Sequence, residues 1–453
     1  MIVMKFGGSS IDSARAFKNV AEIIVSKRKK SPIVVLSASG KTTDRLLESI
    51  DCSINGTPEL GKQLVRKIHS HHQDIAAELS LENEWKQQFD LTAQKYHDEL
   101  MELLTGAALL HDMSSRAMDR VLSHGEKYST LLMSCYLNSV GVQSRLMDSR
   151  TFIKTDDKHT RARPLFAKSN ALISQIFLPE KLNGMVPIVQ GFVGSTLSND
   201  ISTLGRGGSD YTASILGAAL KVDDIEIWSD VDGILTADPT IVAEAKIVQQ
   251  MTFREAAELA YFGAKVLHPD TILPAIENGI PIHIYNTKNP DSSGSLIQDE
   301  LLETEHHPVV KSIAYKENIS VLNIHSTRMF QAHDFLRKVF EVLDRHQMIA
   351  DLVTTSEVSV SIAFHKSINH KPVLEDLQKF SVATVENSKV IVCLVGEQMQ
   401  NFKGLPAKIF QSLDDVHINM ISQGASEVNL SFVISESDIE PVVRTLHTAF
   451  FEG

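Results

Sequence analysis

The sequence has little cysteine, no long apolar run and no excess of positive charge. Its three cysteines, Cys52, Cys135 and Cys393, are far apart and lack CxxC spacing, so neither a disulfide framework nor a structural zinc site is expected. No stretch approaches the roughly 20 apolar residues of a membrane-spanning helix. The apolar start is too short for a signal peptide. We therefore expect a cytoplasmic protein.

The net charge of -12 argues against nucleic acid as the main partner, because binding to a phosphate backbone requires basic surface. The negative net charge does not exclude a local basic pocket that binds phosphates. The 453 residues suffice for two or three domains. With 43% hydrophobic and 22% charged residues, the composition is that of an ordinary globular protein.

The first motif is a glycine turn between a strand and a helix. A short apolar run, Met1–Met4, precedes Lys5, Gly7 and Gly8, and apolar residues of helical spacing follow from Ile11. Glycines let a backbone come close to a ligand, and a helix start favours an anion. The motif therefore predicts either a phosphate site with Lys5 as its point charge or a tight turn with an incidental lysine.

Further strands precede polar or glycine-rich turns. One is expected at Pro32–Leu36, and the segments Val186–Gly194 and Asp224–Ile234 each indicate a strand that runs into a turn. The last strand of the sheet is expected at Ile280–Asn286. Repeated strand–helix units predict a mostly parallel sheet that binds ligands at the carboxyl ends of its strands. The segment 287–294 is rich in Asn, Pro, Asp, Ser and Gly and is typical of a domain boundary.

A second glycine-rich loop spans Thr203–Thr212. Within it, Arg206 can form a fork onto a carboxylate or phosphate, and Asp210 can orient a lysine or hold Mg²⁺. The alternative is a purely structural turn. Lys265 lies among apolar residues, where a cation needs an anion.

Residues 60–140 are predicted to be helical. His69, His71 and His72 lie here, either as a metal site or as part of an exposed polar helix face. Glu126 follows a glycine near a predicted helix start, where it can meet a cationic group or simply complement the helix dipole.

The last part of the chain contains an internal repeat. Residues 339–364 align with residues 409–434 at a constant offset of 70, and each copy reads helix, turn, strand, Ser-Glu turn, strand. Such a pair of small modules predicts a duplicated ligand-sensing or dimerising unit, with a purely structural duplication as the alternative.

Taken together, these motifs resemble the aspartate kinase family along the whole chain. The resemblance rests on Lys5–Ser10, Leu204–Asp210, Phe262–Pro269 and Thr355–Ser359, followed by two repeats of the ACT type. It is to the monofunctional form and is closest to the lysine-regulated class.

The resemblance implies an α/β protein with four parts. An amino-acid-kinase-like catalytic domain, a mostly parallel sheet flanked by helices, would occupy residues 1–290, and a linker residues 291–310. Two α+β ferredoxin-like ACT modules would occupy residues 311–384 and 385–453. Because ACT modules of this family pair between subunits, a homodimer or higher homo-oligomer is implied.

The implied activity is phosphorylation of the side-chain carboxylate of L-aspartate by ATP and Mg²⁺, the first step of lysine, threonine and methionine biosynthesis. The catalytic residues would be Lys5, Asp210 and Lys265. ATP and its phosphates would contact Lys5, Gly7, Gly8, Ser229, Asp230 and Lys265. The substrate aspartate would contact Ser37, Thr43 and Phe192. One of its carboxylates would bind Arg206, and its amino group would bind Glu126. The substrate carboxylate is already a nucleophile, so catalysis reduces to positioning and charge stabilisation.

An end-product amino acid, with lysine favoured, would act as feedback effector. Its pocket would include Met329, Asp351, Thr355, Ser356 and Glu357. The neighbouring segment 331–334 does not match the lysine-regulated pattern well.

Two positions near the nucleotide depart from the family. Leu235 replaces a frequent aromatic residue and Thr240 a frequent arginine, so neither is assigned. Another amino-acid kinase of the same fold and a catalytically silent amino-acid sensor remain as alternative functions.

Overall fold

The computed structural model describes residues 1–263, 269–301, 309–326, 332–367 and 369–452. The chain forms two compact units. Unit 1 comprises residues 1–234, 249–251 and 267–301, and unit 2 comprises residues 235–248, 252–266 and 302–453. Lys265 and Met329, two of the predicted site residues, lie outside the described residues. No helix in the described part of the chain is long and apolar enough to cross a membrane.

Unit 1 is built on an eight-stranded sheet with the order β3-β5-β2-β1-β8-β10-β11-β9. The strands β3, β5, β2, β1, β8 and β10 run parallel to their neighbours, whereas β11 is antiparallel to β10. The mostly parallel sheet predicted from the sequence is therefore confirmed. The prediction that β10 is the last strand is wrong, because β11 follows it in the same sheet and lies within the segment predicted as a linker.

The strands of this sheet are β1 (Ile2–Phe6), β2 (Pro32–Leu36), β3 (Ser144–Met147), β5 (Val186–Gln190), β8 (Asp224–Ser229), β9 (Gln250–Thr252), β10 (Ile282–Asn286) and β11 (Ser295–Gln298). A small second sheet contains β4 (Lys154–Thr155), β6 (Val193–Thr196) and β7 (Ile201–Thr203). The helices of unit 1 are α1 (Ala14–Ser26), α2 (Thr42–Ile54), α3 (Pro58–Glu78), α4 (Asn83–Leu110), α5 (Ser115–Leu122), α6 (His124–Ser139), α7 (Phe166–Ile176), α8 (Pro179–Leu182), α9 (Gly208–Leu220) and α11 (Pro269–Glu277). Short 3-10 helices are η1 (Gly8–Ile11), η2 (Arg28–Lys30) and η3 (Ser149–Thr151).

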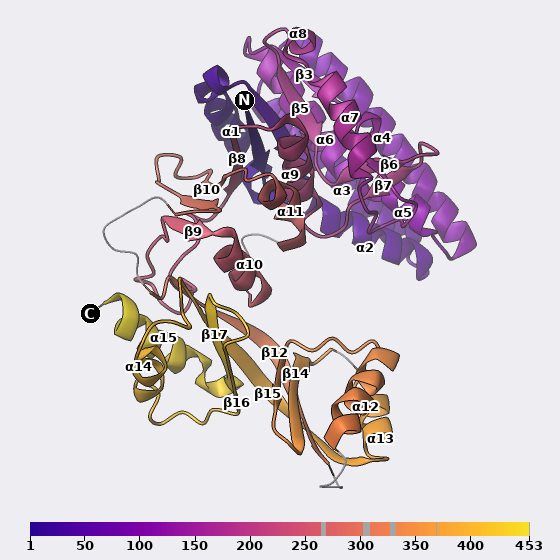
Figure 1. The fold of residues 1–453 in the computed structure, drawn as a ribbon. Helices are drawn as coiled ribbons and strands as arrows, with labels where there is room; N and C mark the ends of the chain where they lie inside the picture. The colour runs from indigo at the N-terminus through magenta and orange to yellow at the C-terminus, as the bar shows by residue number, and fades with distance from the viewer. Residues whose placement is uncertain (264–268, 302–308, 327–331, 368, 453) are drawn as a thin grey trace. The chain divides into compact units, whose positions relative to one another are not determined.

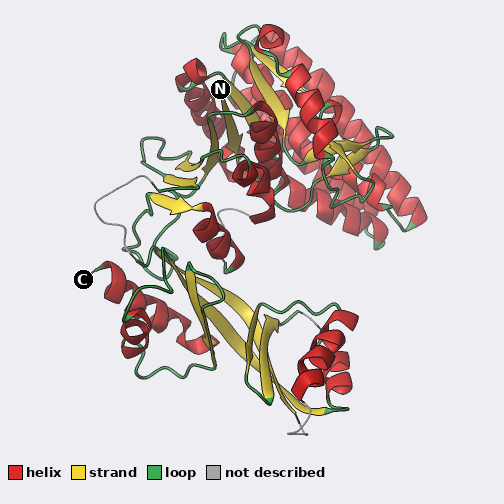
Figure 2. Cartoon of the chain, in the orientation of Figure 1, coloured by secondary structure: helices red, strands yellow, loops and turns green. Residues whose placement is uncertain are grey.

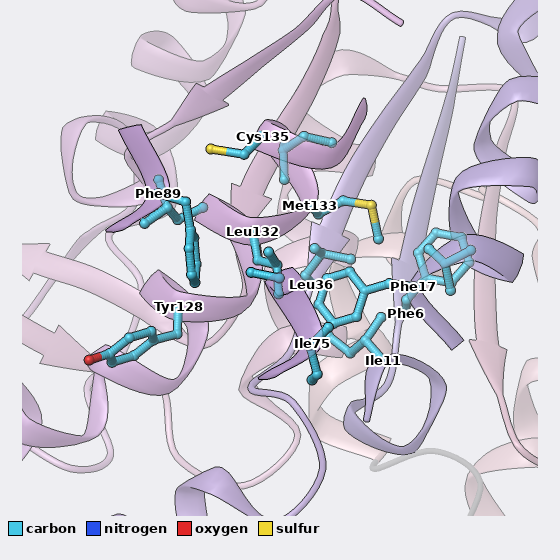
Figure 3. Close-up of a cluster of buried hydrophobic side chains, with 14 of the residues drawn as sticks. Phe6, Ile11, Phe17, Leu36, Ile75, Phe89, Tyr128, Leu132, Met133 and Cys135 are labelled. Carbon is cyan, nitrogen blue, oxygen red and sulfur yellow. The ribbon is translucent and has the colours of Figure 1, made fainter. Parts of the chain in front are cut away.

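Helices cover the central strands because those strands are apolar on both sides. Every residue of β2 is buried. Figure 3 shows Phe6 and Leu36 of neighbouring strands packed with Phe17 of α1 and Leu132 of α6. The helix α9 contacts β1, β2 and β8, and Gly217 lets it approach closely, since a Cβ there would lie 2.6 Å from Ile225.

Unit 2 contains a six-stranded antiparallel sheet with the order β13-β14-β12-β15-β17-β16 (Figures 1 and 2). Its strands are β12 (Ser312–Ser326), β13 (Leu352–Thr355), β14 (Ser359–His365), β15 (Ser381–Val395), β16 (Met420–Gln423) and β17 (Asn429–Ser435). Its helices are α10 (Phe253–Tyr261), α12 (Ala332–Arg345), α13 (Lys371–Leu377), α14 (Leu405–Gln411), α15 (Ile439–Phe451) and the 3-10 helix η4 (Glu436–Asp438).

The predicted repeat is confirmed in this sheet. The strands β14 and β17 begin and end at positions that differ by the same offset of 70. Each half has its own core, one around α12 and α13 and the other around α14 and α15. The two long strands, β12 and β15, contribute residues to both cores, for example Ile313 to one and Leu322 to the other. The two repeats therefore share strands rather than forming separate sheets.

Candidate active site

Of the predicted catalytic residues, Lys5 and Asp210 lie at the carboxyl edge of the parallel sheet. The strands β1, β2 and β8 end in register, since Phe6 is opposite both Leu36 and Trp228. Gln190, at the end of β5, is opposite Leu36 as well. The polar turns that follow these four strands are thus brought to one edge, where parallel α/β sheets bind their ligands.

Lys5 and Asp210 form the central ion pair of this edge. Lys5 lies in β1, one residue before the strand ends, and Asp210 lies in the first turn of α9. Lys5 Nζ is 2.7 Å from Asp210 Oδ1, and the two side chains are 11% and 15% exposed. The pair is partly shielded from water, so its electrostatic interaction is stronger than that of a surface pair. The sequence suggested each residue, and the fold joins them.

The two glycines of the first motif have different surroundings. A Cβ on Gly7 would lie 3.7 Å from the Trp228 carbonyl and 4.0 Å from Lys5 Nζ, which is ordinary contact distance. A Cβ on Gly8 would lie 2.5 Å from the Ala38 carbonyl oxygen. Glycine is therefore required at position 8 by the neighbouring backbone, independently of any ligand. Phosphate contact by either glycine stays a prediction.

Glu126 is a buried carboxylate with one oxygen unsatisfied. It lies in the first turn of α6, and its Oε1 accepts a hydrogen bond from the Ala38 backbone N–H at 3.1 Å. Oε2 is buried and has no partner among the described residues. Burial raises the pKa of the Glu126 carboxyl to about 8. A cationic group placed at Oε2 would satisfy this oxygen and favour the ionised form.

Ser37 and Thr43 flank the turn after β2. The backbone N–H of Ser37 donates to the Phe6 carbonyl at 3.1 Å, which extends the β1–β2 pairing by one residue. The Ser37 carbonyl accepts from the Ser129 hydroxyl of α6 at 2.7 Å. Thr43 is half-buried in the first turn of α2. The turn is thereby fixed between β1 and α6.

Phe192 and the glycine-rich loop lie against each other. The half-buried Phe192 has a φ of +65°, and its N–H donates to the Thr212 hydroxyl of α9 at 3.1 Å. A Cβ on Gly208 would lie 2.7 Å from the Phe192 ring, so only glycine fits there. Arg206 lies on the exposed turn just before α9. Its guanidinium is therefore accessible to a ligand, and its predicted contact with a carboxylate stays a prediction.

Ser229 and Asp230 follow β8. The Ser229 carbonyl accepts two hydrogen bonds from Thr287, one from its N–H and one from its hydroxyl, both at 2.9 Å. The Thr287 hydroxyl also lies 3.0 Å from the Ser10 hydroxyl. These bonds connect the ends of β8 and β10 to η1. Asp230 is exposed and accessible from solvent.

Asp119 is a positioning residue that sequence reasoning missed. Its side chain, within α5, is fully buried and accepts hydrogen bonds from the Thr160 N–H, the Thr203 hydroxyl and His159. It thereby anchors the strand that leads into the glycine-rich loop. No local pattern identifies it, because its partners lie 40 or more positions away in the sequence.

The three histidines of α3 are not a simple exposed face. His72 is fully buried against the ring of Tyr128, and burial lowers the pKa of His72 to about 3. His69 and His71 are only partly buried, and burial lowers the pKa of each imidazole. In the described ranges, no group of three or more His, Cys, Asp or Glu side chains is arranged to hold a metal ion.

The four predicted effector residues that the structure describes lie around β13 in unit 2. Asp351 precedes β13, and its Oδ1 accepts from Lys316 Nζ at 2.5 Å and from the Tyr261 hydroxyl at 3.1 Å. Its Oδ2 is buried without a partner among the described residues. The other three residues, Thr355, Ser356 and Glu357, are exposed at the turn between β13 and β14.

The two unassigned positions, Leu235 and Thr240, also belong to unit 2. The Leu235 carbonyl accepts from the Ser312 hydroxyl at 2.7 Å. The N–H and hydroxyl of Thr240 both bond to Asp238, at 2.9 and 2.6 Å. Both residues are therefore used in local structure, and neither acquires a nucleotide role from these contacts.

Comparisons with known proteins agree with this architecture. The amino acid kinase family model matches residues 1–286, and an ACT domain model matches residues 392–450. Aspartokinase 1 of Arabidopsis thaliana, a chloroplastic enzyme, is 38% identical over 100% of this chain and 80% of its own length.

Two solved structures of E. coli aspartokinase III align with the fold. The complex with aspartate and ADP, in the R-state, has a TM-score of 0.86 at 35% identity and is covered completely in both chains. The complex with lysine and aspartate, in the T-state, has a TM-score of 0.81 at 35% identity, with 100% of this chain and 99% of that chain covered. The chain belongs to the aspartokinase family: it is an aspartate kinase (EC 2.7.2.4) of the amino acid kinase fold, with a C-terminal ACT region that provides allosteric regulation.

Proposed function

We propose that the Lys5–Asp210 pair and the unsatisfied carboxylate of Glu126 are the two anchors of the aspartate kinase reaction in this chain. The observation that carries this assignment is the buried Glu126 Oε2, which has no partner among the described residues and lies near an edge that also holds the shielded Lys5. An α-ammonium group fits Glu126 Oε2, and a transferring phosphoryl group fits Lys5. Glu126 then holds the amino group of L-aspartate, and Lys5 offsets the charge of the phosphoryl group.

In the proposed reaction, an oxygen of the aspartate side-chain carboxylate attacks the γ-phosphorus of ATP. The new O–P bond gives 4-phospho-L-aspartate, and the bond to the β–γ bridging oxygen breaks to release ADP. The carboxylate is already ionised at neutral pH, so no general base is required. Lys5 stabilises the equatorial oxygens, and Arg206 pairs with the second carboxylate of the substrate. Ser37, Thr43 and Phe192 form the remaining walls of the pocket, and Lys265 adds a second positive charge.

Gly7, Gly8, Ser229 and Asp230 are proposed to contact the nucleotide. Mg²⁺ is proposed to accompany it, since the carboxylates of Asp210 and Asp230 are the oxygen ligands that this ion takes from proteins. When bound, Mg²⁺ would neutralise charge on the phosphate oxygens. Asp210 holds the Lys5 ammonium in place through their ion pair.

The proposed effector is L-lysine, bound near Asp351. The support is the buried, unpartnered Asp351 Oδ2, which can accept from an ammonium group, together with the lysine-bound E. coli relative. Thr355, Ser356 and Glu357 form the exposed side of this pocket, and Met329 is predicted to complete it. The variant Asp351→Asn should lose inhibition by lysine while it keeps turnover without lysine.

A homodimer through the ACT region is also proposed. The support is the large apolar side chains that unit 2 leaves exposed, including Phe340 and Ile349 at 45% and 70%. Light scattering after size exclusion would measure the mass of the particle. The cytoplasmic location stays a prediction from the scattered cysteines, since the Arabidopsis relative is chloroplastic.

The decisive experiment is a steady-state assay of ADP release with L-aspartate, L-glutamate or a nucleoside monophosphate as acceptor, with and without lysine, threonine or methionine. We expect release that depends on aspartate and falls with lysine. Turnover with glutamate but not aspartate would favour another amino-acid kinase, and lysine binding without any ATP site would favour a sensor. Inhibition by threonine alone would leave the kinase assignment intact and overturn the lysine assignment.

A further inference from the structure

A charged cavity lies beside the N-terminal turn of α6, apart from the predicted aspartate and nucleotide residues. Its volume is about 540 Å³, and its walls come from α4, α5, α6, the end of β3 and the segment after it, Gln190 at the end of β5, and the β6–β7 hairpin. None of the described residues predicted to bind aspartate or ATP lines it. Glu126 and Lys127 are neighbours on α6 but point to different sides of the helix, because successive residues differ by about 100°. Glu126 reaches Ala38, and Lys127 lines the cavity.

Lys127 is the buried cation of this cavity. Its side chain is 9% exposed, and Nζ lies over the face of the Tyr96 ring, 5.8 Å from the ring centroid. Among the described residues, Nζ has no ion pair of its own. Burial of the side chain lowers the pKa of Lys127 to about 8. Its ammonium lines the cavity without an acceptor from the described part of the chain, so an anion that enters the cavity can accept its N–H bonds.

The carboxylates near Lys127 are already bound to arginines. Glu99 accepts from Arg120 at 2.5 Å, and Asp148 from Arg150 at 2.5 Å. Glu99 also accepts from His124 at 3.2 Å. These carboxylates raise the pKa of Lys127, while the two guanidiniums lower it.

A third arginine, Arg116, pairs with Asp200 at the hairpin. Each guanidinium has five N–H donors, and a carboxylate uses about two of them, so donors remain for a further acceptor. Among the titratable side chains that line the cavity, four cations thus face three carboxylates, and Lys127 is the cation without a carboxylate of its own.

We propose that this cavity is a second binding site, for a small polyanion of phosphate or carboxylate type, with Lys127 as its central ligand and the guanidiniums of Arg116, Arg120 and Arg150 at its rim. The volume suits a molecule of metabolite size. The charge-assisted bonds from Lys127 and the arginine forks match oxyanions. This site does not depend on the kinase assignment, because none of the residues that line it has a proposed role in the kinase reaction.

The test is isothermal titration calorimetry at pH 7 and low salt, on the whole protein saturated with L-aspartate and Mg-ADP so that the kinase site is occupied. The probes are inorganic phosphate and citrate, which separate the phosphate and carboxylate sources of the anion. We expect one of them to bind with millimolar or tighter affinity. In Lys127→Met the Kd should rise roughly tenfold or more, which is the loss of one charge-assisted bond.

The matched control is Lys67→Met, which removes an exposed lysine of α3 outside the cavity and gives the same net charge. It should leave the Kd unchanged. Equal weakening in both variants would mean general electrostatic attraction and overturn the site, as would the absence of binding by both probes.

A second measurement does not depend on any variant. Pulse acetylation with acetic anhydride at pH 8, followed by peptide mass spectrometry, should modify Lys127, because a large fraction of an amine with a pKa of about 8 is unprotonated there. The bound probe should protect Lys127 and leave Lys67 unprotected. Unchanged labelling of Lys127 at saturating probe would contradict the proposal.

Discussion

Replacing Glu126 by glutamine should change how the stability of unit 1 depends on pH. In the folded protein, burial raises the pKa of the Glu126 carboxyl from 4.5 to about 8. The folded state therefore binds this proton more tightly than the unfolded state does. The free energy of unfolding consequently falls as the pH rises from 4.5, the pKa in the unfolded chain, to about 8, the pKa in the folded protein, and is constant above that pH.

The magnitude follows from the size of this shift. At about 1.4 kcal/mol per pKa unit, the raised pKa of Glu126 lowers the free energy of unfolding, relative to low pH, by about 5 kcal/mol above pH 8 and by about 3 kcal/mol at pH 7. Glutamine is neutral at every pH and keeps an acceptor for the Ala38 N–H. The free energy of unfolding of Glu126→Gln, relative to the native sequence, should therefore grow by about 3 kcal/mol between pH 5 and pH 8.

Urea unfolding followed by tryptophan fluorescence at pH 5, 6.5 and 8 measures this difference. Both tryptophans, Trp85 and Trp228, belong to unit 1, which also contains Glu126, so the signal reports on the relevant unit. Glu48→Gln, at an exposed position of α2, is the control and should show no such trend. A constant difference between Glu126→Gln and the native sequence from pH 5 to pH 8 would refute the reasoning.

The raised pKa of Glu126 also predicts that a proton is released when the substrate binds. At pH 7, about nine-tenths of the free protein carries a proton on Glu126. If the ammonium group of aspartate binds at Oε2, this proton is released. Calorimetry in buffers of different ionisation enthalpy should count roughly one proton released per aspartate, and none in Glu126→Gln.

Three other substitutions test the fold and the site. Lys5→Ala should lower kcat by about 100-fold or more with a smaller change in the KM for aspartate, because a charge that stabilises the transition state is lost; near-normal turnover would remove Lys5 from the mechanism. Gly8→Ala should reduce stability by about 1–3 kcal/mol in thermal unfolding without ligands, because its Cβ would lie 2.5 Å from the Ala38 carbonyl; an unchanged Tm would show that the backbone relaxes freely. Lys311→Met should destabilise unit 2 by about 3–5 kcal/mol, because it leaves the buried Glu255, now 2.9 Å from Lys311 Nζ, without its cationic partner. The double variant with Glu255→Gln should recover much of this loss in far-UV circular dichroism melts.

Much of the fold could be predicted because its signals are local. The strand Pro32–Leu36 has the predicted bounds, since an unbroken apolar run between polar turns has one good solution in a buried parallel sheet. The prediction failed at β10 and β11, where the polar segment 287–294 is a hairpin connection inside the sheet. Turn composition is the same at a domain boundary and in a hairpin, so composition could not distinguish them.

The sequence by itself determined the two glycine-rich motifs, the order of strands and helices that makes a parallel sheet, and the repeat at an offset of 70. These depend on residues close together in the chain, whose backbone preferences and apolar spacing act locally. Only the tertiary structure decided that Lys5 pairs with Asp210, that Gly8 is required by the Ala38 carbonyl, and that Glu126 and Lys127 face different surroundings. Burial and partner distance set the charge state of each side chain, and both are fixed by segments far apart in the sequence that meet only in the folded protein.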